Sequence, residues 1–164
     1  MSSELEQAGS DNRLRIERWR AVLSDASKEV FLLMVGEELF VPEDANPFVL
    51  SEVAGMVGLA GELCGVLTIR CSKAAAGKIA CQMLGVAENE AAAQAIDAVG
   101  EICNMVAGNF KAKIAGLEDK CMLSVPTVIS GDSYELHSLA SGERIELPLL
   151  FHGEPVWFSL EVQN

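Results

Sequence analysis

An alanine-rich segment, Ala91–Ala115, constrains the fold more than any other part of the chain. It reads AAAQAIDAVGEICNMVAGNFKAKIA, and its alanines and unbranched side chains, with no proline among them, favour a single α-helix. Asn89 and Glu90 precede the segment as a helix cap and a first-turn acid, and Gly116 follows it as a C-terminal stop. We therefore expect one long helix here, with the rest of the chain organised around it.

The expected helix has an apolar side and a small, polar side. At 100° per residue, the apolar side, which should face the core, contains Ala92, Ala95, Ile96, Val99, Ile102, Cys103, Val106, Phe110 and Ile114. The opposite stripe contains Asp97, Glu101, Asn104 and Gly108, with Gly100 beside it. A carboxylate and an amide thus lie one turn apart on a face without bulky neighbours, and such a face suits close approach to another molecule.

The spacing of this pair carries little weight alone, because Glu-x-x-Asn occurs three times: Glu43/Asn46, Glu101/Asn104 and Glu161/Asn164. The middle pair is the one predicted to share a helix face, since Pro47 disfavours helical geometry before it and the last pair lies in an alternating, strand-like stretch. A glutamate on a helix surface is usually a solvated charge, whereas a mid-helix asparagine is unfavourable and needs a reason. The pair Glu101 and Asn104 therefore fits two interpretations, a solvated helix surface and a functional site.

Composition narrows the class of protein. A chain of 164 residues fits one domain, expected over residues 11–164 after a mobile polar tail at residues 1–10. Half of the residues are apolar (50%) and mean hydropathy is +0.27, but we expect neither a membrane span nor a signal peptide, because no uncharged apolar run is long enough and none follows a basic region. The net charge of −12 excludes nucleic acid and anionic membranes as partners.

Cysteine and histidine give no sign of a metal site. The odd number of cysteines forms no C-x-x-C pair, and His137 and His152 are the only histidines available to assist them. We expect reduced, buried thiols in a cytoplasmic protein, and no metal bound by this chain.

The other elements follow an α+β pattern. Helices are expected over Asn12–Gly36 and Lys73–Leu84, and strands over Phe48–Leu59, Leu63–Cys71, Cys121–Ile129, Tyr134–Leu139, Ile145–Phe151 and Val156–Val162. The last strand alternates apolar residues with Trp157, Ser159 and Glu161, which predicts one buried and one outward face. Together these elements predict an antiparallel sheet of about six strands that helices cover on one face.

An internal repeat divides the chain into two similar units, at about residues 13–71 and 90–162. DASKEV, residues 25–30, aligns with DAVGEI, residues 97–102, and keeps the Asp, the Ala, the Glu and an aliphatic residue. We therefore expect duplicated helix–strand–hairpin units joined in a pseudo-two-fold sheet.

The second copy contains a short motif of four residues. It consists of an acid, then Glu-x-x-Asn, then a glycine four residues after the asparagine, and these positions are Asp97, Glu101, Asn104 and Gly108. This pattern resembles the motif of the CheX/CheC/FliY phosphatases of bacterial chemotaxis. The segment LSVPTVISG at residues 123–131 is similar to the strand that follows the motif helix in that family. With the duplicated architecture, the resemblance extends from about Arg13 to the C-terminus.

One intact motif in the second copy is the pattern of the CheX type, since CheC-like members usually carry two. In the first copy Glu29 takes the place of Glu101, but Leu32 stands where the second copy has Asn104. The resemblance therefore implies that the first copy has no active site.

The resemblance implies hydrolysis of the aspartyl phosphate of a response regulator, typically phosphorylated CheY. Asn104 would position the attacking water, and Glu101 would pair with a lysine of the regulator, so these are the expected catalytic residues. The expected docking surface adds Asp97, Gly100, Gly108 and Lys111. No cofactor need be bound by this chain, because Mg²⁺ is expected in the regulator's own pocket.

A cytoplasmic homodimer is the expected assembly, because surplus apolar residues and open sheet edges favour pairing of identical chains. The alternative function is a non-catalytic module that docks a regulator, or a component of a flagellar or signalling assembly. Asn104 discriminates between them, because docking alone does not need an amide that orients water.

Overall fold

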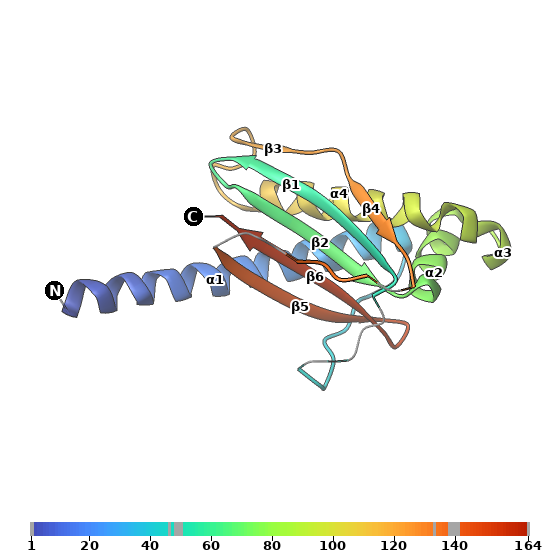
Figure 1. Ribbon diagram of the computed structural model, residues 1–164, viewed down its shortest axis with the longest axis horizontal. Coiled ribbons are helices and arrows are strands. Elements are labelled where there is room, and N and C mark those ends of the chain that lie inside the picture. Colours follow the sequence, from blue (N-terminus) through green and yellow to red (C-terminus); the bar gives the residue numbers. More distant parts are fainter. Residues whose placement is uncertain (1, 46, 48–50, 133, 138–141, 164) are drawn as a thin grey trace.

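Two long helices, α1 and α4, lie side by side across one face of an antiparallel sheet (Figure 1). The computed structural model describes residues 2–45, 47, 51–132, 134–137 and 142–163. Its helices are α1 (Ser2–Val30), which continues as a π-helical turn (Phe31–Val35), α2 (Lys73–Leu84), α3 (Glu88–Ala91) and α4 (Ala95–Lys113). Its strands are β1 (Val53–Gly61), β2 (Gly65–Cys71), β3 (Cys121–Leu123), β4 (Thr127–Ser130), β5 (Glu143–Phe151) and β6 (Glu154–Val162).

The strand order is symmetric about its centre. The six-stranded sheet runs β3-β1-β2-β6-β5, and β4 also pairs with β1 beyond β3. The hairpins β1–β2 and β5–β6 meet at the central β2–β6 pair, and an isolated bridge between Phe40 and Leu150 flanks β5 where β3 and β4 flank β1. The expected α+β fold with a pseudo-two-fold, six-stranded antiparallel sheet is confirmed.

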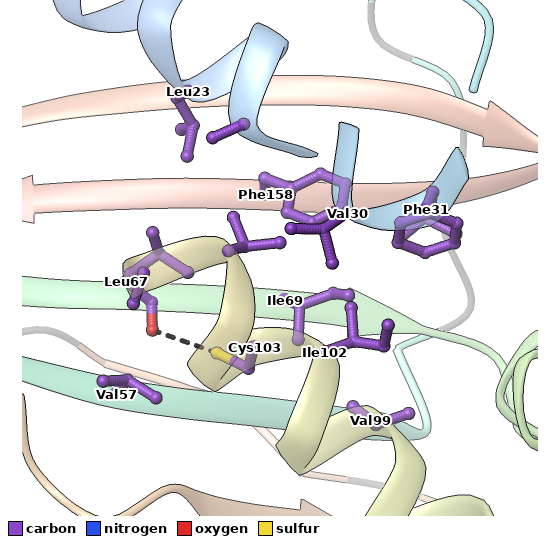
Figure 2. Packing of buried hydrophobic residues seen from close by; sticks show 14 of the residues in the cluster. Leu23, Val30, Phe31, Val57, Leu67, Ile69, Val99, Ile102, Cys103 and Phe158 are labelled. Atoms are coloured by element: carbon purple, nitrogen blue, oxygen red, sulfur yellow. Dashed lines mark hydrogen bonds between the residues drawn. The ribbon is translucent and has the colours of Figure 1, made fainter. Parts of the chain in front are cut away.

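The core lies between the two long helices and the sheet (Figure 2). Phe31 of the π-helical turn packs edge-on against Phe151 and Phe158, with ring centroids 5.5 and 6.1 Å apart. In β6, the apolar residues of the predicted alternation are buried, and so is Ser159 on the opposite face, at 3% exposure. Ser159 lies on the outward face, as the alternation predicts, but it is buried there because β6 is a central strand and Ser159 pairs with Thr68 of β2 on one side and Glu146 of β5 on the other.

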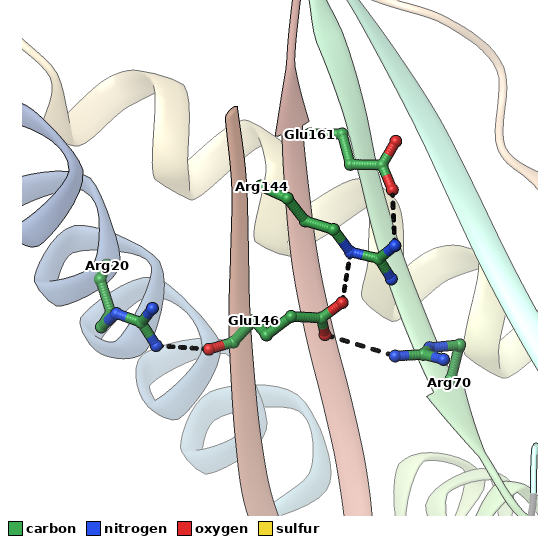
Figure 3. A network of polar contacts seen from close by, with 5 residues as sticks. All are labelled: Arg20, Arg70, Arg144, Glu146 and Glu161. Carbon is green, nitrogen blue, oxygen red and sulfur yellow. Dashed lines mark hydrogen bonds and ion pairs between the residues drawn. The ribbon is translucent and has the colours of Figure 1, made fainter. Parts of the chain in front are cut away.

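In the described part of the chain, no helix covers the opposite face of the sheet, which carries a network of charges (Figure 1 and Figure 3). Glu146 of β5 accepts from Arg144 and, at 3.3 Å, from Arg70 of β2, while Arg144 also lies 3.3 Å from Glu161 of β6. Arg20 of α1 donates to the backbone carbonyl of Glu146 and so connects the helix layer to the β5 edge. These pairs link three neighbouring strands across their solvent side.

Several boundaries differ from the sequence-based expectation at the N-terminal ends of the helices. α1 begins at Ser2, well before Asn12, so residues 2–10 are helical here; their mobility stays a prediction. The expected single helix from Ala91 is divided into α3, a 3-10 turn (Ala92–Gln94) and α4. Ala87, not Asn89, is the N-cap residue of α3. Two residues near the start of α4 that were expected in the core are exposed. They are Ala92 and Ile96, and Ile96 is 42% exposed.

Two of the strand predictions are wrong in part, and two of the predicted strands include residues that the structure does not describe. The expected strand Cys121–Ile129 is divided into β3 and β4 by residues 124–126, and residues 134–137 of the expected strand Tyr134–Leu139 form no strand. Its remaining residues, and Phe48–Leu50 of the strand expected to begin at Phe48, lie outside the described residues. The stops at Gly36 and Gly85 are confirmed, with φ of 77° and 64°. The stop expected at Gly116 is wrong, because α4 ends at Lys113 with Ile114 as its C-cap residue.

Among the residues that the structure describes, no helix is both long enough and apolar enough to cross a lipid bilayer.

Candidate functional site

The predicted stripe lies on the side of α4 that faces away from the core. Val99, Ile102, Cys103, Val106 and Phe110 of α4 are fully buried, as the periodicity predicts. On the other side Asp97 and Glu101 are exposed, Asn104 and Gly108 are half-buried, and Gly100 is buried. The structure thus brings the expected acid, amide and glycines onto one helix surface.

The two glycines of the stripe receive the segment that joins β3 to β4. A Cβ atom at Gly100 would lie 3.1 Å from Val128 Cγ2 and 3.7 Å from Pro126 Cβ. A Cβ atom at Gly108 would lie 3.9 Å from Leu123 Cδ1. Small residues at these helix positions therefore let the edge of the sheet approach α4 closely, on both sides of the turn that carries Asn104.

The segment opposite that turn is a β-bulge, which we call the 124–126 bulge. Leu59 of β1 pairs with Leu123, and Met56 pairs with Thr127, so residues 57–58 of β1 face residues 124–126. Proline at 126 has no N–H to donate to the ladder, which agrees with the break in pairing. This bulge was not predicted from the sequence, although a proline inside a strand-like run is a usual sign of one.

The functional groups of the stripe are unengaged. In the part of the chain that the structure describes, no hydrogen bond or ion pair involves the side chains of Asp97, Glu101 or Asn104. The next polar residues of α4 are all occupied: Asn109 and Lys113 contact Glu29, and Lys111 donates to the carbonyls of Glu118 and Cys121 at 2.9 and 2.8 Å. Free polar groups on α4 are therefore concentrated where the sequence placed the site.

Lys111 has a structural role in the free protein. Its two bonds hold the turn between α4 and β3, which ends with Cys121 at the start of the strand. Whether Lys111 also meets a partner stays a prediction.

The corresponding acid of the first copy, Glu29, is used differently. Its carboxylate accepts from Lys113 Nζ at 2.7 Å and from Asn109 Nδ2 at 3.0 Å, and these bonds hold the pKa of Glu29 below its ordinary value. Leu32, which stands where the second copy has Asn104, is 53% exposed. The first copy therefore presents an apolar side chain and an occupied acid.

Among the described residues, the stripe is separate from the two grooves of the molecule. A groove of about 700 Å³ lies on the uncovered face of the sheet, between strand residues such as Thr68 and Ser159 and the overlying Leu136 and His137. A smaller one of about 210 Å³ lies beside α2. Neither includes a residue of the stripe, so in the described part of the chain Glu101 and Asn104 lie on a helix surface outside both grooves. Chemistry on such a surface needs a substrate that brings its own pocket.

The cysteines offer no obvious alternative site. Burial raises the pKa of the thiols of Cys71 and Cys103 to about 12, so both are protonated at neutral pH. Cys121 is also buried, but Cys81 is half-buried and Cys64 is exposed, which corrects the expectation that the thiols are all buried. Among the described residues, no group of three or more His, Cys, Asp and Glu side chains could hold a metal ion.

Comparison with known proteins identifies similar chains. The family model described as chemotaxis phosphatase CheX matches residues 53–150, a range that contains α4 and the 124–126 bulge. A relative from Thermotoga maritima, described as CheY-P phosphatase CheX, is 28% identical over 120 residues, which cover 69% of this chain and 76% of the relative.

Solved structures share the fold. Chemotaxis protein CheX from Vibrio vulnificus superposes with a TM-score of 0.74 at 24% identity, covering 88% of this chain and 96% of that one. A CheC-like protein from Shewanella gives a TM-score of 0.76 at 21% identity, covering 89% and 97%. The CheX chain of a complex with CheY, BeF3 and Mg from Borrelia burgdorferi gives 0.72 at 20% identity, covering 88% and 97%.

Proposed function

Because the chain belongs to the chemotaxis phosphatase CheX family, we propose that it hydrolyses the aspartyl phosphate of a CheY-like response regulator. The observation that carries the proposal is the pair Glu101 and Asn104, unengaged on an open helix surface outside the two cavities. The relative described as a CheY-P phosphatase and the complex of a CheX with CheY support a response regulator as the substrate. Such a substrate makes the cytoplasm the expected location.

An aspartyl phosphate suits a catalyst that has no pocket. In a response regulator, the phosphoryl group already lies against a Mg²⁺ ion and a lysine, which stabilise charge as the bond to the carboxylate breaks. The missing component is a water molecule held in line with that bond. This chain need therefore supply neither a metal nor a covalent nucleophile.

Asn104 is proposed to hold that water. Its amide oxygen accepts a hydrogen bond from the water, while its NH₂ group is free to bond the phosphoryl oxygens or the regulator's backbone. An amide is uncharged, so it approaches the negative phosphoryl group without repulsion. It is half-buried on the turn between Gly100 and Gly108, on the side of α4 that faces away from the core.

Glu101 is proposed to fix the register of the complex. A carboxylate is repelled by a phosphoryl group, so its partner is the regulator's lysine, with which it forms a charge-assisted hydrogen bond. Asp97 lies one turn earlier on the same exposed side and adds to the negative potential that faces this lysine.

The test replaces Asn104 by alanine and measures two quantities on the same regulator. Decay of the phosphoaspartate gives turnover, and titration against a regulator carrying a phosphoryl mimic gives docking affinity. Asn104→Ala should lower turnover about 10²-fold or more and change affinity far less, because the water is positioned in the transition state.

Asn109→Ala is the matched control. It removes the same group from the same helix, but Asn109 donates to Glu29 and faces α1. It should keep the parental turnover. If Asn104→Ala hydrolyses the regulator at the parental rate, the chain is instead a non-catalytic module that docks the regulator or belongs to a larger signalling assembly.

A further inference from the structure

We propose that Gly55 of β1 is a positioning residue for the reaction at Asn104, because the absence of a side chain at Gly55 lets α4 lie close to the sheet just before Asn104. This inference rests on the proposed function and concerns how the chain holds the amide that positions the water. Asn104 itself touches the water, whereas Gly55 acts on it only through the helix.

Three side-chain atoms surround the place where Gly55 has no side chain. A Cβ atom at Gly55 would lie 3.1 Å from Ile69 Cγ2, 3.2 Å from Val99 Cγ1 and 3.3 Å from Cys103 Cβ. Ile69 belongs to β2, and both Val99 and Cys103 lie on the buried side of α4. All three distances are tighter than an ordinary van der Waals contact, so an alanine at residue 55 requires its neighbours to move by a few tenths of an ångström.

The backbone of Gly55 does not itself require glycine. Its φ lies outside the left-handed region, and it pairs in the ladder with Ile69 of β2 and Val128 of β4. Glycine weakens the interior of a strand, because it has no side chain to pack and loses more backbone freedom than other residues. A glycine at such a position often marks the close approach of another element, which here is α4.

A methyl group added at Gly55 would push against α4. β1 is held in the sheet on both sides, by β2 on one edge and by β4 on the other. Cys103 Cβ is bonded to the helix backbone and cannot rotate away, and the β-branched side chain of Val99 has one strongly preferred rotamer in a helix. Figure 2 shows Cys103 against the sheet, where its Sγ donates to the carbonyl of Leu67 at 3.7 Å. The helix would therefore shift outward at Cys103, the residue directly before Asn104.

A second close contact holds the same part of α4. Val128 is the cross-strand partner of Gly55, and its Cγ2 would lie 3.1 Å from a Cβ atom at Gly100. Gly100 is buried, so it meets β4 in the free protein. The two glycines together fix the distance between the sheet and the turns that carry Glu101 and Asn104. A displacement of about 1 Å in a catalytic group can lower a rate about 10²-fold, so a shift of a few tenths is measurable.

The test adds one methyl group at residue 55 and separates turnover from docking. Gly55→Ala should lower kcat at saturating regulator about 5- to 10-fold. Its Kd for a regulator carrying a phosphoryl mimic should stay within about threefold, because exposed side chains such as Glu101 can adjust, whereas the alignment of the water cannot. The matched control is Gly77→Ala in α2, where the added Cβ meets open space. This control should keep the parental kcat and Kd.

A double-mutant cycle tests whether the effect passes through α4. Val99→Ala removes the Cγ1 atom that the new methyl group would meet. Gly55→Ala should therefore lower kcat less in the Val99→Ala background than in the parent. An equal loss of kcat in both backgrounds overturns the inference. So does a Gly55→Ala protein with a lower Tm and the parental kcat, because Gly55 would then be only structural.

A second variant keeps the inference testable if Gly55→Ala does not fold. Gly100→Ala should also lower kcat, and Val128→Ala added to it should restore kcat, because it removes the Cγ2 atom at 3.1 Å. A kcat that is parental in Gly100→Ala, or not restored by Val128→Ala, then overturns the inference. A parental rate in Asn104→Ala instead overturns the proposed function itself. Loss of hydrolysis in Asn104→Ala with a parental kcat in Gly55→Ala overturns only the positioning role.

Discussion

Lys113 Nζ of α4 lies 2.7 Å from Glu29 Oε1 of α1, so the first-copy acid that aligns with Glu101 joins two helices of its own chain. Asn109 donates to the other oxygen of the same carboxylate. An acid held in this way is not available to a partner's lysine. The duplication has thus left one copy with a candidate site and the other with a helix–helix contact.

Restoring the asparagine should not restore a site. Leu32→Asn places an amide on the exposed side of the π-helical turn that follows α1, but Glu29 remains bonded to Lys113 and Asn109. We expect parental turnover per chain and an unchanged fold, measured by phosphoaspartate decay and by circular dichroism. A doubled turnover per chain would contradict this interpretation.

The same contact should make stability depend on pH. Bonding to Lys113 and Asn109 lowers the pKa of folded Glu29, so its stabilising contribution is present above the unfolded pKa of about 4.3 and disappears as pH falls through the lower folded value. Glu29→Gln should therefore lower Tm at pH 7. It should have little effect on Tm at a pH below the pKa of folded Glu29, where the parent carboxyl group is also uncharged. An equal loss of Tm at every pH would rule out a charge-dependent role.

The glycines of the stripe should respond unequally to alanine. Both substitutions gain about 1 kcal/mol of helix propensity. At Gly108 the new Cβ meets Leu123 Cδ1 at an ordinary 3.9 Å, so Gly108→Ala should be stabilised by about that amount. At Gly100 it meets Val128 Cγ2 at 3.1 Å, and overpacking costs about 1–3 kcal/mol. Denaturant unfolding should give a higher free energy of unfolding for Gly108→Ala than for Gly100→Ala. The reverse order would show that β4 can shift away from residue 100 at little cost.

The role of Glu101 should be visible in salt dependence. Glu101→Gln removes the charge and keeps the shape, so affinity for the regulator and turnover should both fall at low ionic strength. The difference in Kd between variant and parent should shrink as salt rises, since screening already weakens the charge pair in the parent protein. A difference that is constant with salt would argue against a charge pair at this position.

The edges of the sheet predict the oligomeric state of the protein. Among the described residues, no further strand lies beside β3/β4 or beside most of β5. Such edges favour pairing of identical chains, and we predict a homodimer joined along sheet edges. Light scattering at tens of micromolar protein should give twice the mass of one 17.5 kDa chain. A monomer mass under those conditions would disprove the prediction.

The polar stripe of α4 could be predicted from sequence because helical periodicity gives the side of a helix on which each residue lies. Asp97, Glu101 and Asn104 are accordingly together on the outer side. Periodicity does not show how far the core extends along the helix. Ile96 therefore lies on the predicted apolar side of α4 and is still 42% exposed. Nor does it detect the 3-10 turn before α4, which alanine-rich sequence tolerates without a local signal.

What sequence could not supply were contacts between distant segments. The bonds from Lys113 and Asn109 to Glu29 join positions in different copies of the repeat, and nothing in either local pattern requires them. The close packing of β4 on Gly100 depends on the bulge at Ser124, whose position is fixed by its pairing with β1. Both features depend on tertiary structure, and both shape the candidate site.

The pairing of β2 with β6 at the centre of the sheet has a consequence for synthesis. Residues 65–70 acquire their second neighbour from residues 157–162, so on the ribosome the β1–β2 hairpin emerges long before the strand that pairs with it. Until then β2 has a bare, apolar edge, and the helix that carries Asn104 forms above an incomplete sheet. Such distant pairing slows folding and leaves the nascent chain open to aggregation until β6 has emerged.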